Sequence, residues 1–133
     1  MTLNVTMVVP EGKIWAGPAE RVIAKTLDGD IGLLTGHTPV LGILAEGSVV
    51  RILPGEAGPA AGEGELLAAV NGGFLALADD RVSILARQAQ LGADVDTAAA
   101  RAALEAAEQA AGDEETADIR YYRALLRAAG ARS

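Results

Sequence analysis

Few side chains in this sequence of 133 residues have a type and spacing that could support catalysis. The sequence contains one histidine, His37, no cysteine and three serines. The spacing between His37 and the serines gives no reason to pair any of them as a nucleophile and its general base. Asp28 and Asp30 are separated by a single residue, which is more typical of a turn than of a catalytic carboxylate pair. No group of His, Asp and Glu has metal-ligand spacing. We therefore expect a protein that is not an enzyme, with no catalytic, cofactor-binding or metal-binding residue.

The histidine belongs to a segment, residues 29–39, that also contains three glycines and a proline. Glycine adopts backbone angles that other residues resist, and proline fixes its own φ angle. Because the segment follows a strand-like run, we interpret it as a loop of defined shape, a kind of segment that often carries function. His37 is then either a structural hydrogen-bonding residue of the loop or a contact residue at an interface.

Near the C-terminus, three arginines fall on one line of a predicted helix, at the spacing i, i+3, i+7: Arg120, Arg123 and Arg127. The neighbouring line is apolar and contains Ile119, Tyr122 and Leu126. One interpretation is an amphipathic helix whose charged edge faces solvent. The other is an arginine ladder that binds acidic side chains of a partner, because like charges on one helix face repel one another without a counter-surface.

The composition restricts the function further. The formal net charge is −7 and the pI is about 4.6, which argues against nucleic-acid binding. Hydrophobic residues make up 50% of the sequence but aromatic residues only 3%, so we expect a core of aliphatic side chains. We find no signal-peptide pattern at the start and no apolar run long enough to span a bilayer. Residues 119–133 hold four arginines and no acidic residue, which predicts an acidic surface opposite them.

The elements that must position these residues change character along the chain. In the first two thirds, alternating or apolar runs predict strands at residues 3–9, 22–27, 48–53, 65–70, 74–78 and 82–86. Turns rich in Gly, Pro and Asp separate them, a pattern typical of an antiparallel β-sandwich or a flattened barrel. Residues 54–64 are rich in glycine and proline, and we interpret them as a solvent-exposed loop between two strands.

The last third of the sequence predicts a hairpin of two helices. Asp96 is a suitable N-cap for an alanine-rich helix, and Gly112 is suited to end it. The acidic residues 113–115 favour the start of a second helix, which should continue to about Ala129 after a break of only about one or two residues. Because alanine faces bury little apolar area, the hairpin should dock weakly and detach at low cost.

Three features of the sequence occur together in one known family. Residues 29–39 read Gly-Asp-x-Gly-x-x-x-Gly-His-x-Pro after a strand. Residues 70–77 place Gly-Gly before an aliphatic strand, and residues 81–86 form the strand that precedes the helices. The third feature is the order itself, in which strands are followed by an alanine-rich helical hairpin. These features cover nearly the whole chain and resemble the epsilon subunit of the rotary F-type ATP synthase.

The resemblance implies a fold and a role. The fold would be α+β, with an N-terminal antiparallel β-sandwich of about ten strands in residues 1–88 and a C-terminal two-helix hairpin in residues 89–133. The protein would be a non-catalytic rotor subunit of the central stalk, and its sandwich would join the gamma subunit to the c-ring. Asp30 aligns with a c-ring-facing position, and His37 and Gly42 align with gamma-facing positions. It would lie at the cytoplasmic face of the bacterial cell membrane, associated only through the complex.

The resemblance also gives the hairpin a regulatory role. Extended into the catalytic hexamer, its basic residues would meet an acidic segment of the beta subunit and oppose ATP hydrolysis, a role assigned here to the arginine ladder. Family members that bind ATP carry Asp-x-x-Arg-Ala at the start of the first helix. Here Ala99 takes the arginine position, and Arg101 lies about 200° around the helix from it, so we expect no ATP binding. The alternative functions are a standalone protein-binding β-sandwich module and an ATP-sensing regulator.

Overall fold

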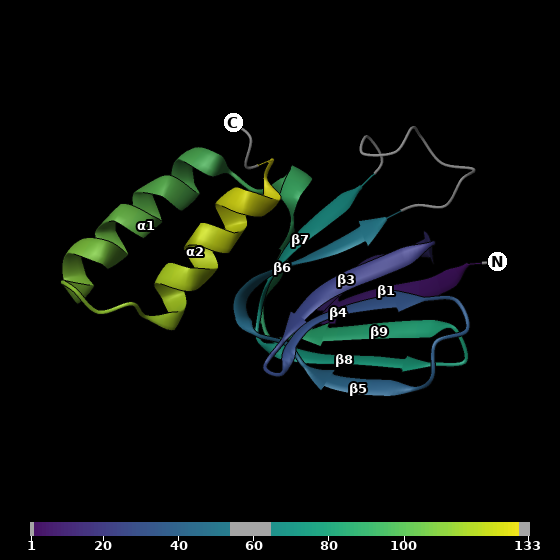
Figure 1. The fold of residues 1–133 in the computed structure, drawn as a ribbon. Helices are drawn as coiled ribbons and strands as arrows, with labels where there is room; N and C mark the ends of the chain where they lie inside the picture. Colours follow the sequence, from purple (N-terminus) through teal and green to yellow (C-terminus); the bar gives the residue numbers. More distant parts are fainter. Residues whose placement is uncertain (1, 54–64, 131–133) are drawn as a thin grey trace.

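The computed structural model describes residues 2–53 and 65–130, which form a β-sandwich with a helical hairpin on one side (Figure 1). The described strands are β1 (Leu3–Val9), β2 (Gly12–Ala19), β3 (Arg21–Thr26), β4 (Gly29–Leu34), β5 (Val40–Ile43), β6 (Glu46–Leu53), β7 (Leu66–Asn71), β8 (Gly73–Ala78), β9 (Arg81–Ala86) and β10 (Ala89–Leu91). The helices are a short 3-10 helix, η1 (Gly92–Asp94), followed by α1 (Thr97–Ala111) and α2 (Ala117–Ala128). The predicted fold class, ten strands followed by two helices, is confirmed. The loop predicted for residues 54–64 lies outside the described residues.

The strands form two five-stranded sheets. The first sheet has the order β2-β1-β9-β8-β5 and the second has the order β10-β7-β6-β3-β4. Among the described strands, every pair is antiparallel except β1–β9, which runs parallel with Asn4 opposite Arg81. The predicted antiparallel sandwich is therefore correct apart from this pair. Because β1 and β9 lie far apart in the sequence, no hairpin turn constrains their relative direction.

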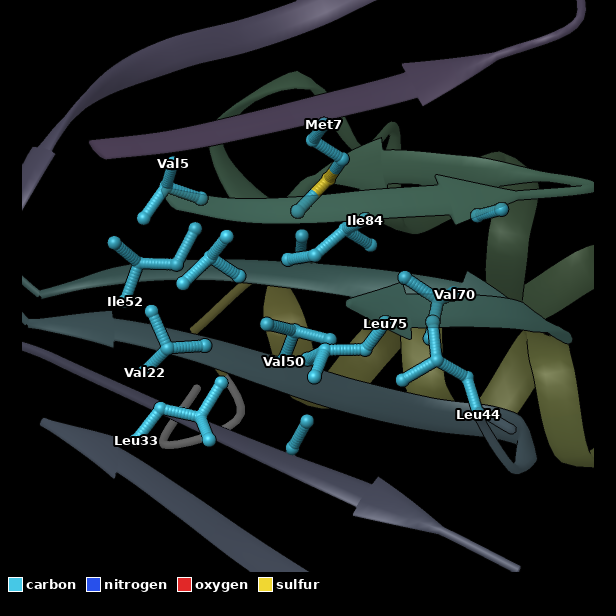
Figure 2. Packing of buried hydrophobic residues seen from close by; sticks show 14 of the residues in the cluster. Val5, Met7, Val22, Leu33, Leu44, Val50, Ile52, Val70, Leu75 and Ile84 are labelled. Atoms are coloured by element: carbon cyan, nitrogen blue, oxygen red, sulfur yellow. The ribbon is translucent and has the colours of Figure 1, made fainter. Parts of the chain in front are cut away.

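The sheets close over a core of aliphatic side chains, as the composition predicts. In β1, the alternate residues Leu3, Val5 and Met7 are buried, while the residues between them are exposed or half-buried. Figure 2 shows Met7 and Ile84 of the first sheet pointing into the same interior as Val50 of the second. Because both sheets contribute alternate residues, the core joins strands from most of residues 3–86.

The six predicted strands are present within one or two residues of their predicted bounds. The loop predicted for residues 29–39 is wrong in its first half, because Gly29–Leu34 form β4, which pairs along its whole length with β3. Leu33 is buried and Ile31 is half-buried on the same face of β4. This alternate packing outweighs the weak strand preference of the glycines, so only residues 35–39 remain as a loop.

The hairpin begins where the sequence predicts but is spaced differently. The Asp96 side chain accepts a hydrogen bond from a backbone N–H at the start of α1, and Gly112 ends this helix at φ 65°. The N-cap of α2 is Thr116, whose hydroxyl accepts a backbone N–H at 3.2 Å. The acidic residues 113–115 therefore belong to the connection, and the break is longer than predicted. None of the described helices is long and apolar enough to cross a bilayer.

The hairpin docks through α2, which lies across β6 and β7, while α1 covers the outer side of α2 (Figure 1). The docking cluster is built largely from alanines and consists of Ala69, Ala100, Tyr121, Ala124, Leu125 and Ala128. The predicted apolar line is wrong in part, since Ile119 is buried but Tyr122 and Leu126 are only half-buried. The small side chains of Ala124 and Ala128 let the helix backbone approach the sheet closely, so the buried line runs through them.

Candidate functional site

Two arginines of α2 contact the sandwich at a bulge in β6. Arg120 Nη2 lies 3.4 Å from the Glu46 carboxylate, and Arg127 Nη2 donates a hydrogen bond of 3.2 Å to the carbonyl oxygen of Gly47. The same Glu46 carboxylate accepts a hydrogen bond of 2.7 Å from Arg87, which follows β9. Glu46 therefore links a cation of the hairpin to a cation of the sandwich.

Arg123 has different partners, and both lie within the hairpin segment. Its guanidinium contacts Glu115 at 2.5 Å and Glu108 at 3.1 Å. The hydrogen bonds that it donates, first to Glu108 and then to Glu115, raise the pKa of Arg123 above its ordinary value. Arg120 and Arg123 therefore have acidic partners in this conformation, but those partners belong to the same chain, and Arg127 binds a backbone carbonyl oxygen instead.

The charge balance at Glu46 follows from these contacts. The hydrogen bond from Arg87, and to a smaller extent the one from Arg120, lowers the pKa of the Glu46 carboxyl group below its ordinary value. Both ion pairs are partly exposed, so each is screened by water and contributes little by itself. What distinguishes Glu46 is that it binds both halves of the molecule at once.

A cavity of about 600 Å³ lies beside these contacts, between α2 and the second sheet. Lys25 and Asp30 contribute to its wall from β3 and β4, and the arginine ladder contributes from α2. The structure thus brings Asp30, which the resemblance assigns to the c-ring, to the same cavity as the arginines assigned to inhibition. Acidic and basic side chains therefore both line this cavity.

His37 lies beyond the opposite end of β4 from Asp30, so the structure does not bring these two predicted residues together. Its Nδ1 atom lies 2.7 Å from the carbonyl oxygen of Thr38, and its side chain is exposed. The loop is held in place because the Gly36 N–H donates a hydrogen bond of 2.8 Å to Asp80 in the β8–β9 turn. His37 is therefore presented to solvent by a loop whose backbone is tied down.

Gly42 lies in β5, at the edge of the first sheet, opposite Leu75 of β8. A Cβ atom at this position would lie 3.1 Å from the Thr26 side chain, so glycine lets β5 pack closely against the end of β3. The flanking residues Leu41 and Ile43 are both exposed. Gly42 therefore sets the position of a strand whose neighbouring side chains face solvent.

An apolar row, which the sequence analysis missed, crosses the outer face of the first sheet. It consists of Ile43, Phe74 and Leu85, which are paired across β5, β8 and β9 and are each about half exposed. Leu41, next to the row on β5, is 75% exposed. A signal was present in the sequence, because runs such as residues 74–78 are apolar at successive positions and not only at alternate ones. These neighbouring exposed apolar side chains make the outer face of the first sheet a candidate interaction surface.

Comparison with known proteins identifies the family. The profile described as ATP synthase, Delta/Epsilon chain, beta-sandwich domain matches residues 2–92. The ATP synthase epsilon chain of Thermobifida fusca (strain YX) is 50% identical over 132 residues, covering 97% of this chain and 93% of that protein. The ATP synthase epsilon chain of Streptomyces griseus is 39% identical over 128 residues, covering 94% and 97% of the two chains.

Two solved structures share the fold. A chain of the Euglena gracilis mitochondrial ATP synthase, in a cryo-EM structure of OSCP/F1/c-ring, has a TM-score of 0.68 at 21% identity, over 94% of this chain and 75% of that one. A chain of the Tetrahymena thermophila mitochondrial ATP synthase central stalk/c-ring has a TM-score of 0.55 at 16% identity, over 92% and 95%. At these identities the structures support the fold alone. On the family profile and the nearly full-length sequence relatives, the chain belongs to the ATP synthase epsilon chain family, a non-catalytic subunit of the proton-transporting F-type enzyme.

Proposed function

We propose that this chain is a rotor subunit of the central stalk, in which residues 1–88 join the gamma subunit to the c-ring and residues 89–133 oppose ATP hydrolysis. The observation that carries the first part is the apolar row, in which three large apolar side chains are exposed side by side on a well-packed sheet. Such a surface is stabilised when a partner covers it. A closely packed sandwich has low compressibility, which suits a joint that transmits torque.

The gamma subunit is the proposed occupant of the apolar row. Gly42 lies next to Ile43 in β5, and His37 lies in the loop that leads into the other end of β5, beside the β8–β9 turn, so the two residues assigned to gamma lie along the same edge of the first sheet as the row. Burial of the row would supply most of the affinity, at about 25 cal/mol per Å² of apolar surface removed from water. The exposed imidazole of His37 would add a polar contact at the rim of the interface.

The c-ring is the proposed partner of Asp30. Asp28 and Asp30 are exposed around the turn between β3 and β4, where carboxylates can accept hydrogen bonds from the polar loops of another subunit. Through such subunit contacts alone, the chain would be held peripherally at the cytoplasmic face of the bacterial cell membrane.

The hairpin is the proposed inhibitory arm, which acts when the arginine ladder meets an acidic segment of the beta subunit. In the docked hairpin all three arginines bind groups of their own chain, so the arm must leave the sandwich before Arg120 and Arg127 can reach another subunit. The hairpin docks weakly, largely through alanines, which favours a two-state arrangement. A partner that binds the released state only slightly better than the docked state is then enough to shift the equilibrium between them.

Substitution of Phe74 tests the stalk assignment. The unaltered full-length chain should bind the isolated gamma subunit, and Phe74→Asp should weaken this binding by about tenfold to a hundredfold, because it replaces a central apolar contact with a charge. Isothermal titration calorimetry measures the affinity, and circular dichroism checks that the variant is folded. Ala98→Asp, which adds the same charge at an exposed position of α1, is the control and should bind as the unaltered chain does.

Two results would count against the stalk assignment. Equal affinity of the folded Phe74→Asp variant and the unaltered chain would show that the apolar row is not the gamma interface. Absence of any binding by the unaltered chain would favour the standalone protein-binding module instead.

A further inference from the structure

The bulge in β6 is built from residues 46–48. The pairing with β7 passes from Glu46 opposite Asn71 to Ser48 opposite Val70, which leaves Gly47 as the extra residue. Gly47 has φ +66°, and the Ser48 hydroxyl donates a hydrogen bond of 2.8 Å to the carbonyl oxygen of Ala45. The bulge is therefore a fixed feature of the sandwich, held from inside by a buried hydroxyl group.

The backbone of α2 approaches the bulge more closely than any side chain would permit. A Cβ atom at Gly47 would lie 2.5 Å from the carbonyl carbon and the Cβ atom of Arg120. Real Cβ atoms essentially never come within 3.0 Å of another heavy atom, so a side chain at residue 47 would push α2 away from the sheet. Glycine at this position is thus a condition for docking as well as for the left-handed backbone.

The polar groups of the bulge bind the same helix. The Glu46 carboxylate contacts Arg120, and the Gly47 carbonyl oxygen accepts a hydrogen bond from Arg127, two turns further along α2. Arg87 fixes the Glu46 side chain on the sandwich side at 2.7 Å. Glu46 and Gly47, two adjacent residues of β6, therefore provide both the close steric fit and the polar contacts that hold α2.

We propose that this bulge is the receptor that holds the arm on the sandwich, and that Glu46 and Gly47 set the fraction of molecules in which the arm is released. The assignment divides the arginine ladder into two classes. Arg120 and Arg127 bind the sandwich, and these contacts break on release, whereas the longer contacts of Arg120 with Glu115, at 4.0 Å to its carboxylate and 3.4 Å to its carbonyl oxygen, stay within the arm. Arg123 binds only Glu108 and Glu115 among the described residues, and these travel with the arm, so its contacts survive release.

The consequence for regulation rests on the proposed inhibitory function. If the arginines that oppose ATP hydrolysis are also the ones that the bulge holds, the bulge and the beta subunit compete for Arg120 and Arg127. A change that weakens the bulge should then increase inhibition without altering any residue of the arm. This separates the receptor from the arm itself, because Glu46 and Gly47 belong to the sandwich.

Single-molecule energy transfer in the full-length chain tests the receptor directly. The sequence has no cysteine, so Ser83→Cys in β9 and Asp118→Cys in α2, both at exposed positions, supply the label sites. Gly47→Ala should raise the ratio of undocked to docked molecules by about tenfold or more, because the methyl group overlaps the helix backbone. Glu46→Gln should raise the same ratio by about twofold to fivefold, the range expected for an exposed ion pair.

Two control variants separate docking from other effects. Gly36→Ala has a comparable positive φ, +85°, but open space around the new methyl group, so it introduces backbone strain without touching α2. Arg123→Ala removes a ladder arginine that does not bind the sandwich. Both should leave the docked fraction within about twofold of that of the unaltered chain. Equal docked fractions for Gly47→Ala and Gly36→Ala, or a larger release by Arg123→Ala than by Glu46→Gln, would overturn the assignment.

ATP hydrolysis by the reassembled synthase separates this inference from the function on which it rests. A lower docked fraction together with slower ATP hydrolysis in the complexes that carry Glu46→Gln or Gly47→Ala would support both the receptor and the inhibitory arm. Docking loss with unchanged hydrolysis would support the receptor and contradict the inhibitory arm. An unchanged docked fraction in folded Glu46→Gln and Gly47→Ala would contradict the receptor whatever the rate of hydrolysis.

Discussion

The sandwich and the helical hairpin are stabilised by different interactions. The sandwich buries large aliphatic side chains from both sheets, among them Met7, Leu75 and Ile84. The docking cluster of the hairpin contains four alanines, and its large members are Tyr121 and Leu125. The other contacts of the hairpin are partly exposed ion pairs, which salt screens. One region therefore depends on apolar burial and the other on close fit and charge, so different changes should affect each.

The largest expected effect lies in the core of the sandwich. Leu75 of β8 is fully buried between the sheets. Leu75→Ala should lower the free energy of unfolding by about 2–5 kcal/mol, because lost apolar burial is added to the energy of a cavity. Urea unfolding followed by the fluorescence of the single tryptophan, Trp15 in β2, measures it. A decrease in the free energy of unfolding of less than about 1 kcal/mol would mean that core burial does not distinguish the sandwich from the hairpin.

A smaller and more local effect is expected in the hairpin. Leu125→Ala should weaken docking of α2 by about 2–3 kcal/mol while leaving the unfolding of the sandwich nearly unchanged. Hydrogen exchange should then accelerate at amides of α2 but not at those of β1 and β9. Leu104→Ala is the matched control, since Leu104 is half-buried in α1 and lies outside the docking cluster. If Leu125→Ala destabilised the sandwich as strongly as Leu75→Ala does, the molecule would be one cooperative unit.

The smallest expected effect is on the pKa of Glu46. Arg87→Ala should raise this pKa toward its ordinary value of 4.5 more than Arg120→Ala does, because the hydrogen bond from Arg87 lowers it most. An NMR titration of the Glu46 carboxyl carbon measures both. The folded-state pKa is the lower one, so the stabilisation is present above pH 4.5 and is lost as the pH falls through the folded-state pKa. The opposite order of the two variants would make the hairpin, not the sandwich, the main partner of Glu46.

The sequence predicts those elements whose stability is decided locally. The alternation of Leu3, Val5 and Met7 predicts β1, since a strand with one buried face requires that period. The side chain of Asp96 predicts the start of α1, because an N-cap depends on groups within one turn. The ten-strand count and the proposed roles of Asp30, His37 and Gly42 came instead from the resemblance to a family.

The features that the sequence did not predict depend on pairing with distant residues. Gly47 becomes the extra residue of a bulge only when β7 sets the register, so nothing local distinguishes it from a turn glycine. The buried line of α2 depends on how closely the sheet approaches Ala124 and Ala128, and a hydrophobicity pattern gives alanine little weight. The apolar row emerges only when β5, β8 and β9 are placed side by side.

The parallel pairing of β1 with β9 has a consequence for biosynthesis. During translation, β1 cannot find this neighbour until the segment around Arg81–Ala86 has also emerged from the ribosome, so the first sheet cannot be completed soon after β1 is made. Until then the backbone edge of β1 that β9 will occupy has no strand partner. Contacts between such distant parts of a chain also slow folding. The helical arm, which follows the strands in the sequence, therefore meets a sandwich whose closing strands have only just become available.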